Sequence, residues 1–158
     1  MPDLLPPCVA RCFPAVLLVA VLAGCAVAPT APPTLYQRLG GAPRLELVIG
    51  RMIDRAARDP RTRRSFDGIK LAPLKESLVT QLCSISGGAC RYEGETMARA
   101  HADARIVASE FDALVNILRE ELDRAGVDAG AKNELLRLLA PMKREIVGGH
   151  GGAAAPRS

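Results

Sequence analysis

The chain has 158 residues, which is the length of one ordinary domain with short extensions. Apolar residues make up 49% of it and aromatic residues only 3%, and this composition, rich in leucine and alanine, favours helices over sheets. The 21 basic and 17 acidic residues leave a net charge of +4, and the basic residues are scattered along the chain. We therefore expect no nucleic-acid partner.

Residues 1–24 have the pattern of an export signal. Arg11 supplies a positive charge, and the apolar run "FPAVLLVAVLAG" that follows is too short for a permanent membrane span. The letters "LAGC" resemble the lipobox of bacterial lipoproteins, in which the cysteine, here Cys25, is lipidated and becomes the first mature residue. A plain cleaved signal with an incidental cysteine is the alternative.

The lipobox resemblance implies a lipid-anchored protein in the cell envelope of a Gram-negative bacterium. Ala26 after the cysteine favours the outer membrane, with the protein facing the periplasm. Residues 25–34 hold the anchor and a Pro/Ala-rich spacer, which we expect to be extended. The glycine- and alanine-rich residues 148–158 cannot build a core, and we expect them to be disordered. The folded domain is therefore expected at 35–147.

Export also affects how the cysteines are interpreted. Cys8 and Cys12 fall within the signal, so that only Cys83 and Cys90 remain in the folded body. An even number of cysteines in an oxidising compartment predicts a disulfide. A metal site is the competing interpretation, but two thiols without a nearby histidine or a second cysteine pair are a weak pattern for one.

Apolar residues recur at helical spacing through the body, and strand patterns are nearly absent. The stripes that predict the four long helices begin at Leu45, Leu71, Phe111 and Leu135. We expect the first to end at Asp59, which precedes a proline, the second at Gly87 and the third at Gly126. Pro141 is expected to kink the last helix.

Polar residues predict the starts of two helices. Thr96 is expected to cap a short helix that contains Met97 and His101. Ser109, with Asp112 three residues later, resembles a capping box that opens the third long helix. The sequence therefore predicts an all-α domain with four substantial helices and one short one.

His101 is the only histidine in the body of the chain, because His150 lies in the glycine-rich tail. Three interpretations start from the residues alone: an imidazole with ordinary hydrogen bonds, a catalytic base, or a ligand of a metal or haem iron. No serine or cysteine with a supporting carboxylate lies at a recognisable spacing, which disfavours nucleophilic catalysis. The first and third interpretations stay open.

From residue 35 to residue 147 the chain resembles the group 1 truncated haemoglobins, the short two-over-two globins. The resemblance rests on the order of "LYQRLGG", "RDPRTRRSFDGIKL", "SGGACRYEGETMARAH" and "LLAPMKREIV". Each motif alone is weak, but together they are specific. The resemblance implies an all-α, two-over-two helical sandwich with a short proximal helix and one haem b, iron protoporphyrin IX.

The resemblance also implies roles for individual residues. His101 matches the proximal ligand of the haem iron, with its other ring nitrogen held by a carbonyl or a water. The residues that match positions around the haem are Phe66, Tyr92, Met97, Ile106, Phe111 and Leu114. These side chains also suit an ordinary apolar core. Arg105 is long enough to reach a haem carboxylate, although a solvated arginine fits the sequence equally well.

On the distal side of the haem, the chain departs from the family. The position that usually holds a tyrosine aligns with Ile53, and two further positions align with Leu74 and Leu78. A hydrogen bond to bound oxygen contributes about 1–3 kcal/mol, so we expect faster oxygen release without a donor. Thr80 and Gln81 lie further along the same helix and would change this expectation if they pointed inward.

The leading interpretation is an exported haem protein that reversibly binds a small diatomic ligand, namely oxygen, nitric oxide or carbon monoxide. An unidentified reductase is a further expected partner. The alternative is a degenerate globin-fold lipoprotein that serves as a structural or binding module without haem. A dedicated haem enzyme, such as a peroxidase or dioxygenase, ranks below both because the sequence shows no distal acid or base.

Overall fold

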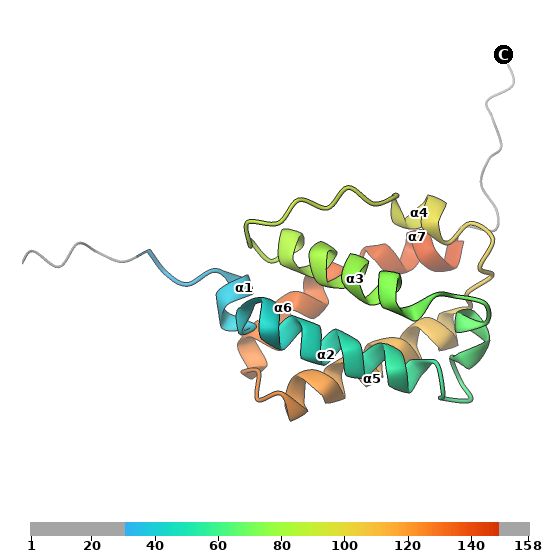
Figure 1. The fold of residues 1–158 in the computed structure, drawn as a ribbon, viewed down its shortest axis with the longest axis horizontal. Coiled ribbons are helices and arrows are strands. Elements are labelled where there is room, and N and C mark those ends of the chain that lie inside the picture. Colours follow the sequence, from blue (N-terminus) through green and yellow to red (C-terminus); the bar gives the residue numbers. More distant parts are fainter. Residues whose placement is uncertain (1–30, 149–158) are drawn as a thin grey trace, which may run out of the picture. The chain divides into compact units, whose positions relative to one another are not determined.

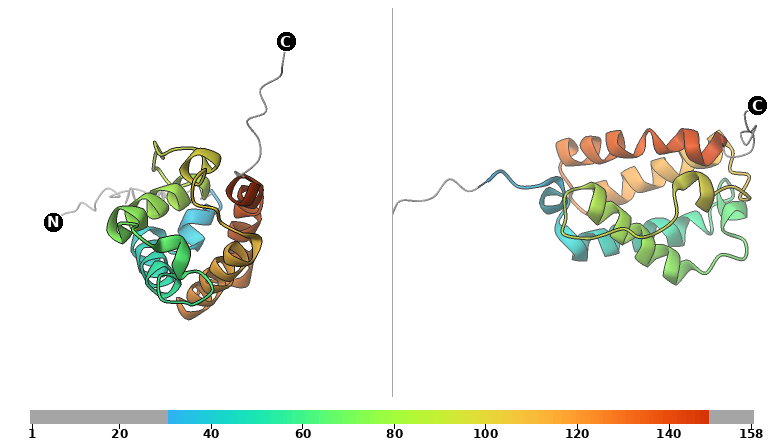
Figure 2. Two further views of the ribbon diagram at one scale, coloured as in Figure 1. Left: turned by 90° about the vertical axis from the view of Figure 1, so that its right-hand side faces the viewer. Right: turned by 90° about the horizontal axis from the view of Figure 1, so that it is seen from above.

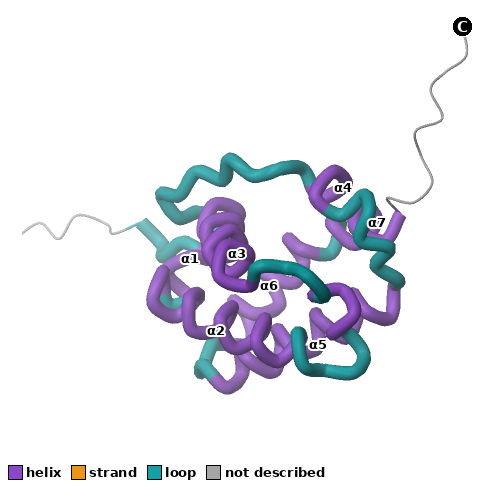
Figure 3. Tube along the Cα trace, turned by 45° about the vertical axis from the view of Figure 1, so that its right-hand side comes forward, coloured by secondary structure: helices purple, strands orange, loops and turns teal. Residues whose placement is uncertain are grey.

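The computed structural model describes residues 31–148, which fold into helices (Figure 1). The helices are α1 (Leu35–Arg38), α2 (Gly41–Ala56), α3 (Leu71–Ile85), α4 (Met97–Ala100), α5 (Ala108–Arg124), α6 (Ala129–Leu139) and α7 (Met142–Gly148), with a 3₁₀ turn at Arg63–Phe66. No strand occurs within the described residues (Figure 3). None of their helices is both long and apolar enough to cross a membrane.

The expected signal, lipid anchor and terminal tail lie almost entirely outside the described part of the chain, at residues 1–30 and 149–158. Cys25 is among them, so its lipidation stays a prediction. The short remainder of the expected spacer, residues 31–34, leads into α1.

Two groups of helices lie against each other and enclose the core (Figure 2). α2 and α3 form one group, and α5 lies beside the α6–α7 run in the other. α2 packs on both α3 and α5. The apolar stripe predicted to begin at Leu45 is buried, since Ile49 and Ile53 are each 1% exposed. The helical pattern of the sequence therefore decides which face of α2 points inward.

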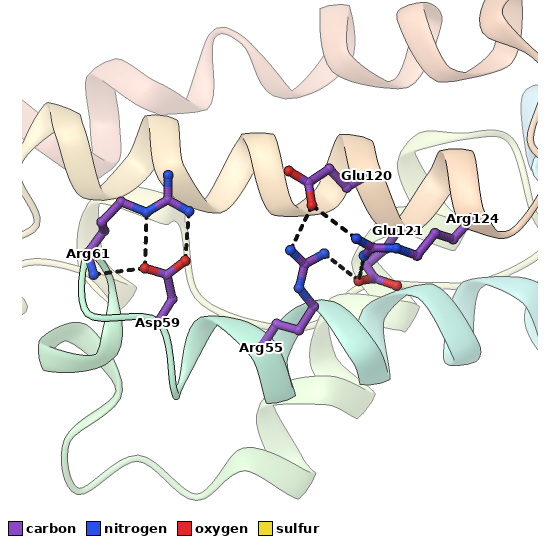
Figure 4. Close-up of polar contacts among 6 residues, drawn as sticks. All are labelled: Arg55, Asp59, Arg61, Glu120, Glu121 and Arg124. Atoms are coloured by element: carbon purple, nitrogen blue, oxygen red, sulfur yellow. Dashed lines mark hydrogen bonds and ion pairs between the residues drawn. The ribbon is translucent and has the colours of Figure 1, made fainter.

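A group of ion pairs joins the C-terminal part of α2 to α5 (Figure 4). Arg55 donates from Nη1 to Glu121 Oε1 at 2.6 Å and from Nη2 to Glu120 Oε2 at 2.7 Å. Arg124 binds the same two carboxylates from within α5. Glu121 is buried, and its two guanidinium partners offset the cost of removing its charge from water. These bonds add to the apolar packing of α2 on α5.

α2 ends at Ala56, earlier than the predicted end at Asp59. The Asp59 carboxylate accepts from the backbone N–H of Arg61 at 2.9 Å and from its guanidinium (Figure 4), and these bonds lower the pKa of Asp59 to about 2. Thr62 donates its hydroxyl to the carbonyl of Ala56 at 2.6 Å. The side-chain hydrogen bonds of this turn therefore compete with a further turn of helix. The disfavoured helical conformation of a residue before proline does not by itself predict this earlier end.

The predicted capping box at Ser109 and Asp112 is wrong. α5 begins at Ala108, with Val107 in the N-cap position, two residues before the predicted cap. Glu110 supplies one half of the box, because its carboxylate accepts from the backbone N–H of Val107 at 2.9 Å. The helix start is therefore stabilised by an acidic side chain in the first turn, which also suits the positive end of the helix dipole.

The last helical stripe is divided at Pro141. α6 ends at Leu139 and α7 begins at Met142, because proline lacks the N–H that would continue the helix and its ring clashes with the preceding turn. The sequence predicts a kink here, and the structure has a complete break. The helix ends predicted at Gly87 and Gly126 are confirmed, and these residues have φ values of 83° and 69°.

The disulfide that the cysteine count predicts joins Cys83 in α3 to Cys90 in the loop that follows, with Cα atoms 5.8 Å apart. Both thiols are consumed, so the alternative metal site is excluded. Gly88 lies inside this closed loop, where a Cβ would come within 2.5 Å of the Cys83 sulfur. Glycine is therefore required for the close approach of the loop to α3.

Candidate functional site

A cavity of ≈ 280 Å³ is lined by residues from both groups of helices. It brings together all the residues that the sequence places at the site: His101, Phe66, Tyr92, Met97, Ile106, Phe111, Leu114, Ile53, Leu74 and Leu78. These positions come from α2, the 3₁₀ turn, α3, α4, α5 and the segments between them. The fold therefore gathers at one place residues that are far apart in the sequence.

His101 lies at the end of α4, in the C-cap position. Its Nδ1 lies 2.9 Å from the backbone carbonyl of Met97, one helical turn earlier. Because a carbonyl oxygen can only accept, Nδ1 carries the proton of the neutral ring and Nε2 keeps its lone pair. A histidine held in this way is oriented to ligate a metal through Nε2. The bond satisfies the need for a carbonyl partner that the resemblance implies.

The segment before His101 is held by local bonds. Thr96 caps α4 as predicted, accepting from the backbone N–H of Arg99 at 3.4 Å. The hydroxyl of Tyr92 donates to the carbonyl of Glu95 at 3.4 Å. The Tyr92 ring lies so close to Gly94 that a Cβ there would be 2.2 Å from its hydroxyl oxygen. Glycine at 94 therefore allows the tyrosine to fold back while lining the cavity.

Apolar side chains form most of the cavity wall. Ile53 of α2 is fully buried, and Leu74 and Leu78 of α3 lie partly buried against the core. Phe66, in the 3₁₀ turn, and Phe111, in α5, supply aromatic surface. A lining of this kind, with few polar groups, suits a large apolar ligand.

The cavity also contains an amide, because Gln81 of α3 lines it and is 7% exposed. Ile53, Leu74 and Leu78 carry no polar donor, and Gln81 points inward, where its Nε2 lies 3.5 Å from the sulfur of Met97 and 4.0 Å from that of Met142. Fast oxygen release stays a prediction. Gln81 follows Leu78 by three residues, so helical spacing places it on the same face. Thr80 does not line the cavity, and its hydroxyl donates to the backbone carbonyl of Glu76 at 3.0 Å.

Glu110 is a second polar residue of the cavity wall, and the sequence analysis missed it. Arg64 binds its carboxylate with two bonds, from Nε at 2.9 Å and from Nη2 at 2.6 Å. Burial raises the pKa of Glu110, but the bonds from Arg64 and from the Val107 N–H outweigh burial, so the pKa lies below its ordinary value. Glu110 is therefore a paired carboxylate at neutral pH and is poorly suited to donate a proton.

Arg64 also donates from Nη2 to the backbone carbonyl of Arg105 at 2.9 Å. It thereby ties the turn that carries Phe66 to the segment between α4 and α5. Arg105 itself has φ of 50°, a left-handed backbone that side chains other than glycine seldom adopt, and it does not line the cavity. In this arrangement Arg105 contributes its backbone carbonyl to the site, and the suggested contact of its side chain with a haem carboxylate stays a prediction.

The donor set of the cavity distinguishes between kinds of ligand. Among residues 31–148, no group of three or more His, Cys, Asp and Glu side chains is placed to hold a metal ion. One imidazole with a free Nε2, surrounded by apolar and aromatic walls, does not match a protein-only metal centre. It does match haem, whose macrocycle supplies the other ligands of its iron and has a large apolar surface.

Comparison with known proteins identifies the family to which this fold belongs. The family profile of the bacterial-like globins matches residues 34–147. A group 1 truncated hemoglobin of Mycolicibacterium paratuberculosis is 30% identical over 121 residues, which cover 77% of this chain and 89% of the relative. Another, from a Nostoc species, is 32% identical over 114 residues, which cover 72% of this chain and 97% of the relative.

Solved structures show the same arrangement of helices. The truncated hemoglobin of Tetrahymena pyriformis in its Fe(III) form superposes with a TM-score of 0.69 at 22% identity, covering 73% of this chain and 98% of that one. The 2/2 hemoglobin of a Synechococcus species, which has covalently attached heme, gives a TM-score of 0.68 at 23% identity, covering 73% and 99%. The predicted all-α, two-over-two fold is confirmed.

Proposed function

Since the chain belongs to the group 1 truncated haemoglobins, we propose that its cavity holds one haem b, with His101 as the protein ligand of the iron. A haem held there would supply an iron that can bind oxygen, nitric oxide or carbon monoxide. The proposed function is therefore reversible binding of a diatomic gas.

The observation that carries this proposal is the state of His101. Its Nδ1 is committed to the Met97 carbonyl at 2.9 Å, so that Nε2 is the ring nitrogen left for the iron. The bond also orients the imidazole before any ligand arrives, which lowers the entropy lost on coordination.

The other lining residues bind and orient the macrocycle. Phe66 and Phe111 offer aromatic surface for stacking, while Leu74 and Leu78 exclude water from the distal side. Tyr92 closes the wall beside α4. Excluding water matters because a hydrogen bond made in a dry pocket is stronger than one made in water.

A non-covalent haem b is the form that the cysteines favour. Within the described residues both cysteines, Cys83 and Cys90, form the disulfide, so neither is available for a thioether bond to a haem vinyl group. We expect the haem to be extracted by acidified organic solvent and to give the pyridine haemochrome spectrum of protoporphyrin IX. A haem that stays with the protein after extraction would contradict this part of the proposal.

The spectrum of the full protein, produced with an ample supply of haem, tests the proposed function. We expect a Soret band in the wild type and its loss or displacement in His101→Ala, because the axial nitrogen is removed. Arg99→Ala is the matched control: Arg99 lies on α4 with its side chain 76% exposed, and this variant should keep the wild-type band.

A wild type that folds but binds no haem would favour the alternative function, a structural or binding module of globin fold. An unchanged spectrum in His101→Ala would show that another residue ligates the iron. Circular dichroism of each variant separates these outcomes from simple unfolding.

We further propose that the protein is exported and anchored in the outer membrane by lipids on Cys25, facing the periplasm. The pattern "LAGC" after an apolar run supports this, and so does a disulfide in the folded domain, since disulfides persist in oxidising compartments. Cells fed a labelled fatty acid should label the wild type and a Cys8→Ser control but not Cys25→Ser. Equal labelling of Cys25→Ser, or none in the wild type, would contradict the anchor.

A further inference from the structure

The exposed members of the cavity wall mark where the cavity reaches the surface. Of the described residues that line it, Ile69 is 49% exposed and Ala100 is exposed, whereas the others are buried or half-buried. Ile69 follows the 3₁₀ turn, and Ala100 is the last residue of α4, directly before His101. The mouth of the cavity therefore lies between two segments, residues 63–70 and residues 100–107, which we call the first and the second rim.

Arg64 spans the mouth from the first rim to the second. Its Nη2 donates to the backbone carbonyl of Arg105 at 2.9 Å and to Oε2 of Glu110 at 2.6 Å, and its Nε donates to Oε1 of Glu110 at 2.9 Å. Glu110 is itself fixed to the second rim, because its carboxylate accepts from the backbone N–H of Val107 at 2.9 Å. Two-pronged bonds between a guanidinium and a carboxylate are among the stronger polar contacts in proteins. We call these three bonds of Arg64 the clamp.

Apolar burial holds the first rim only weakly. None of the four residues of the 3₁₀ turn is buried, and residues 67–70 are exposed. Phe66, which lines the cavity, is half-buried against the core. The rim is anchored at its start, where the buried Thr62 donates to the Ala56 carbonyl, and at its end, where α3 begins at Leu71. A segment with so few buried side chains opens locally at a small cost in free energy, so the clamp strongly influences how often the mouth opens.

The second rim has an unfavourable backbone conformation where the clamp reaches it. Arg105 has φ of 50°, in the left-handed region that costs steric energy for a residue with a Cβ. Its carbonyl accepts one of the bonds from Arg64, and that bond offsets part of the cost. Loss of the clamp would therefore free Arg105 to relax, and the second rim would change shape together with the first.

We propose that Arg64 is the gate residue of the haem site: the clamp must break before haem enters or leaves, so that Arg64 sets the rate of haem exchange and not the affinity. This inference rests on the proposed function. Arg64 is a positioning residue, since it does not line the cavity itself. The clamp joins one part of the chain to another, so it resists opening in the empty and in the filled cavity alike. The Arg64 side chain is 54% exposed, which lets water replace its bonds while the core stays folded.

The test measures both directions of haem exchange. Stopped-flow mixing of haem-free protein with carbon-monoxide-bound haem gives the entry rate, and transfer from loaded protein to excess apomyoglobin gives the loss rate. Removal of a partly solvated, two-pronged ion pair in Arg64→Ala should raise both rates about three- to tenfold, by factors that agree within about twofold. Arg63→Ala is the matched control: Arg63 is exposed in the same turn and its side chain makes none of the clamp bonds, so both rates should stay at the wild-type level.

A double-variant comparison tests whether Arg64 acts through Glu110. Glu110→Gln alone should raise both rates, because it weakens the same bonds. The variant with both substitutions should exchange haem no faster than Arg64→Ala, within about twofold, since no further clamp bond is left to remove. Effects that multiply in the double variant would show that the two residues act independently and would overturn the clamp.

Two other results would overturn the gate and leave haem binding by His101 untouched. A rise in the loss rate alone would mean that Arg64 stabilises the filled cavity, and unchanged rates with an intact Soret band would mean that the clamp does not limit exchange. A wild type without a Soret band would instead refute the proposed function, and the gate with it. Arg64→Lys keeps the charge without the two-pronged bond. It should give a smaller rise in both rates, and it carries the test if the alanine variant does not fold.

Discussion

At the scale of single residues, Glu110 is a buried carboxylate whose charge matters for the site. It accepts from Arg64 and from the Val107 N–H, and its carboxylate lies on the cavity wall. Arg64 in turn binds the Arg105 carbonyl. One charged side chain therefore connects the start of α5 to the turn that carries Phe66.

Glu110→Gln isolates the contribution of that charge. In the folded protein the pKa of Glu110 lies below its ordinary value of 4.5. The charge therefore stabilises the fold fully above pH 4.5, and the stabilisation is lost as the pH falls through the folded pKa. We expect the glutamine variant to be less stable by about 1 kcal/mol at neutral pH, since Arg64 is partly solvated. The difference should disappear in acid, where wild-type Glu110 becomes neutral too.

Urea unfolding at neutral pH and well below pH 4.5 measures this difference. Glu46→Gln, on an exposed residue of α2, is the control and should change little at either pH. A deficit of Glu110→Gln that persists in acid would mean that shape, and not charge, is responsible.

Gln81 shows what a sequence pattern leaves undecided. The stripe of α3 is recognised by its leucines, and a glutamine between them is ordinarily assigned to the solvent side. The structure turns it inward because it follows Leu78 by three residues and finds Met97 and Met142 as partners. Helical spacing places Gln81 on the inner face of α3, whereas its polar side chain favours the solvent side. Only the tertiary contacts decide between the two orientations.

At the scale of elements, the segment between α3 and α4 has no helix and runs along the outside of α3 (Figure 1). The disulfide between Cys83 and Cys90 ties its first half to α3, and Tyr92 lines the cavity two residues later. A covalent link therefore takes the place of helical hydrogen bonds in fixing this segment.

Replacing both cysteines by serine should destabilise the domain by about 2 kcal/mol. The disulfide restricts the unfolded chain, and because the loop that it closes is short, the conformational entropy regained without it is modest. Equilibrium unfolding of the double variant and of the wild type, with and without a dithiol reductant, measures this effect. The reductant should bring the wild type to the level of the variant and leave the variant unchanged. Equal stability of oxidised wild type and variant would contradict the role of the disulfide.

The sequence predicts helices better than it predicts their ends. The ends at Gly87 and Gly126 follow from a backbone conformation that glycine adopts easily, so one residue is enough to identify them. The end of α2 and the start of α5 depend on bonds from Thr62 and Glu110, whose partners are known only after folding. Local conformation is readable from sequence, whereas competition between side-chain bonds is not.

At the scale of the whole molecule, the cavity is assembled from most of the helices. Periodicity alone predicts an all-α domain. It cannot predict that Ile53 and His101 line the same cavity, because the number of residues between them does not determine their distance in the fold. The order of motifs shared with the truncated haemoglobins supplied that link, and the cavity contains all the residues so placed. Glu110 lies outside the family motifs used and was found only in the structure, which also decides that Gln81 points inward and Thr80 does not.

The most direct test of the central claim, that Nε2 of His101 ligates a haem iron, is chemical rescue. His101→Gly removes the imidazole and leaves room for a free one, so the variant should bind haem with a wild-type-like Soret band only when imidazole is added. Resonance Raman spectroscopy of the reduced sample should then show an iron–imidazole stretch. Wild-type-like haem binding by His101→Gly without imidazole, or no response to imidazole in a folded variant, would contradict the account.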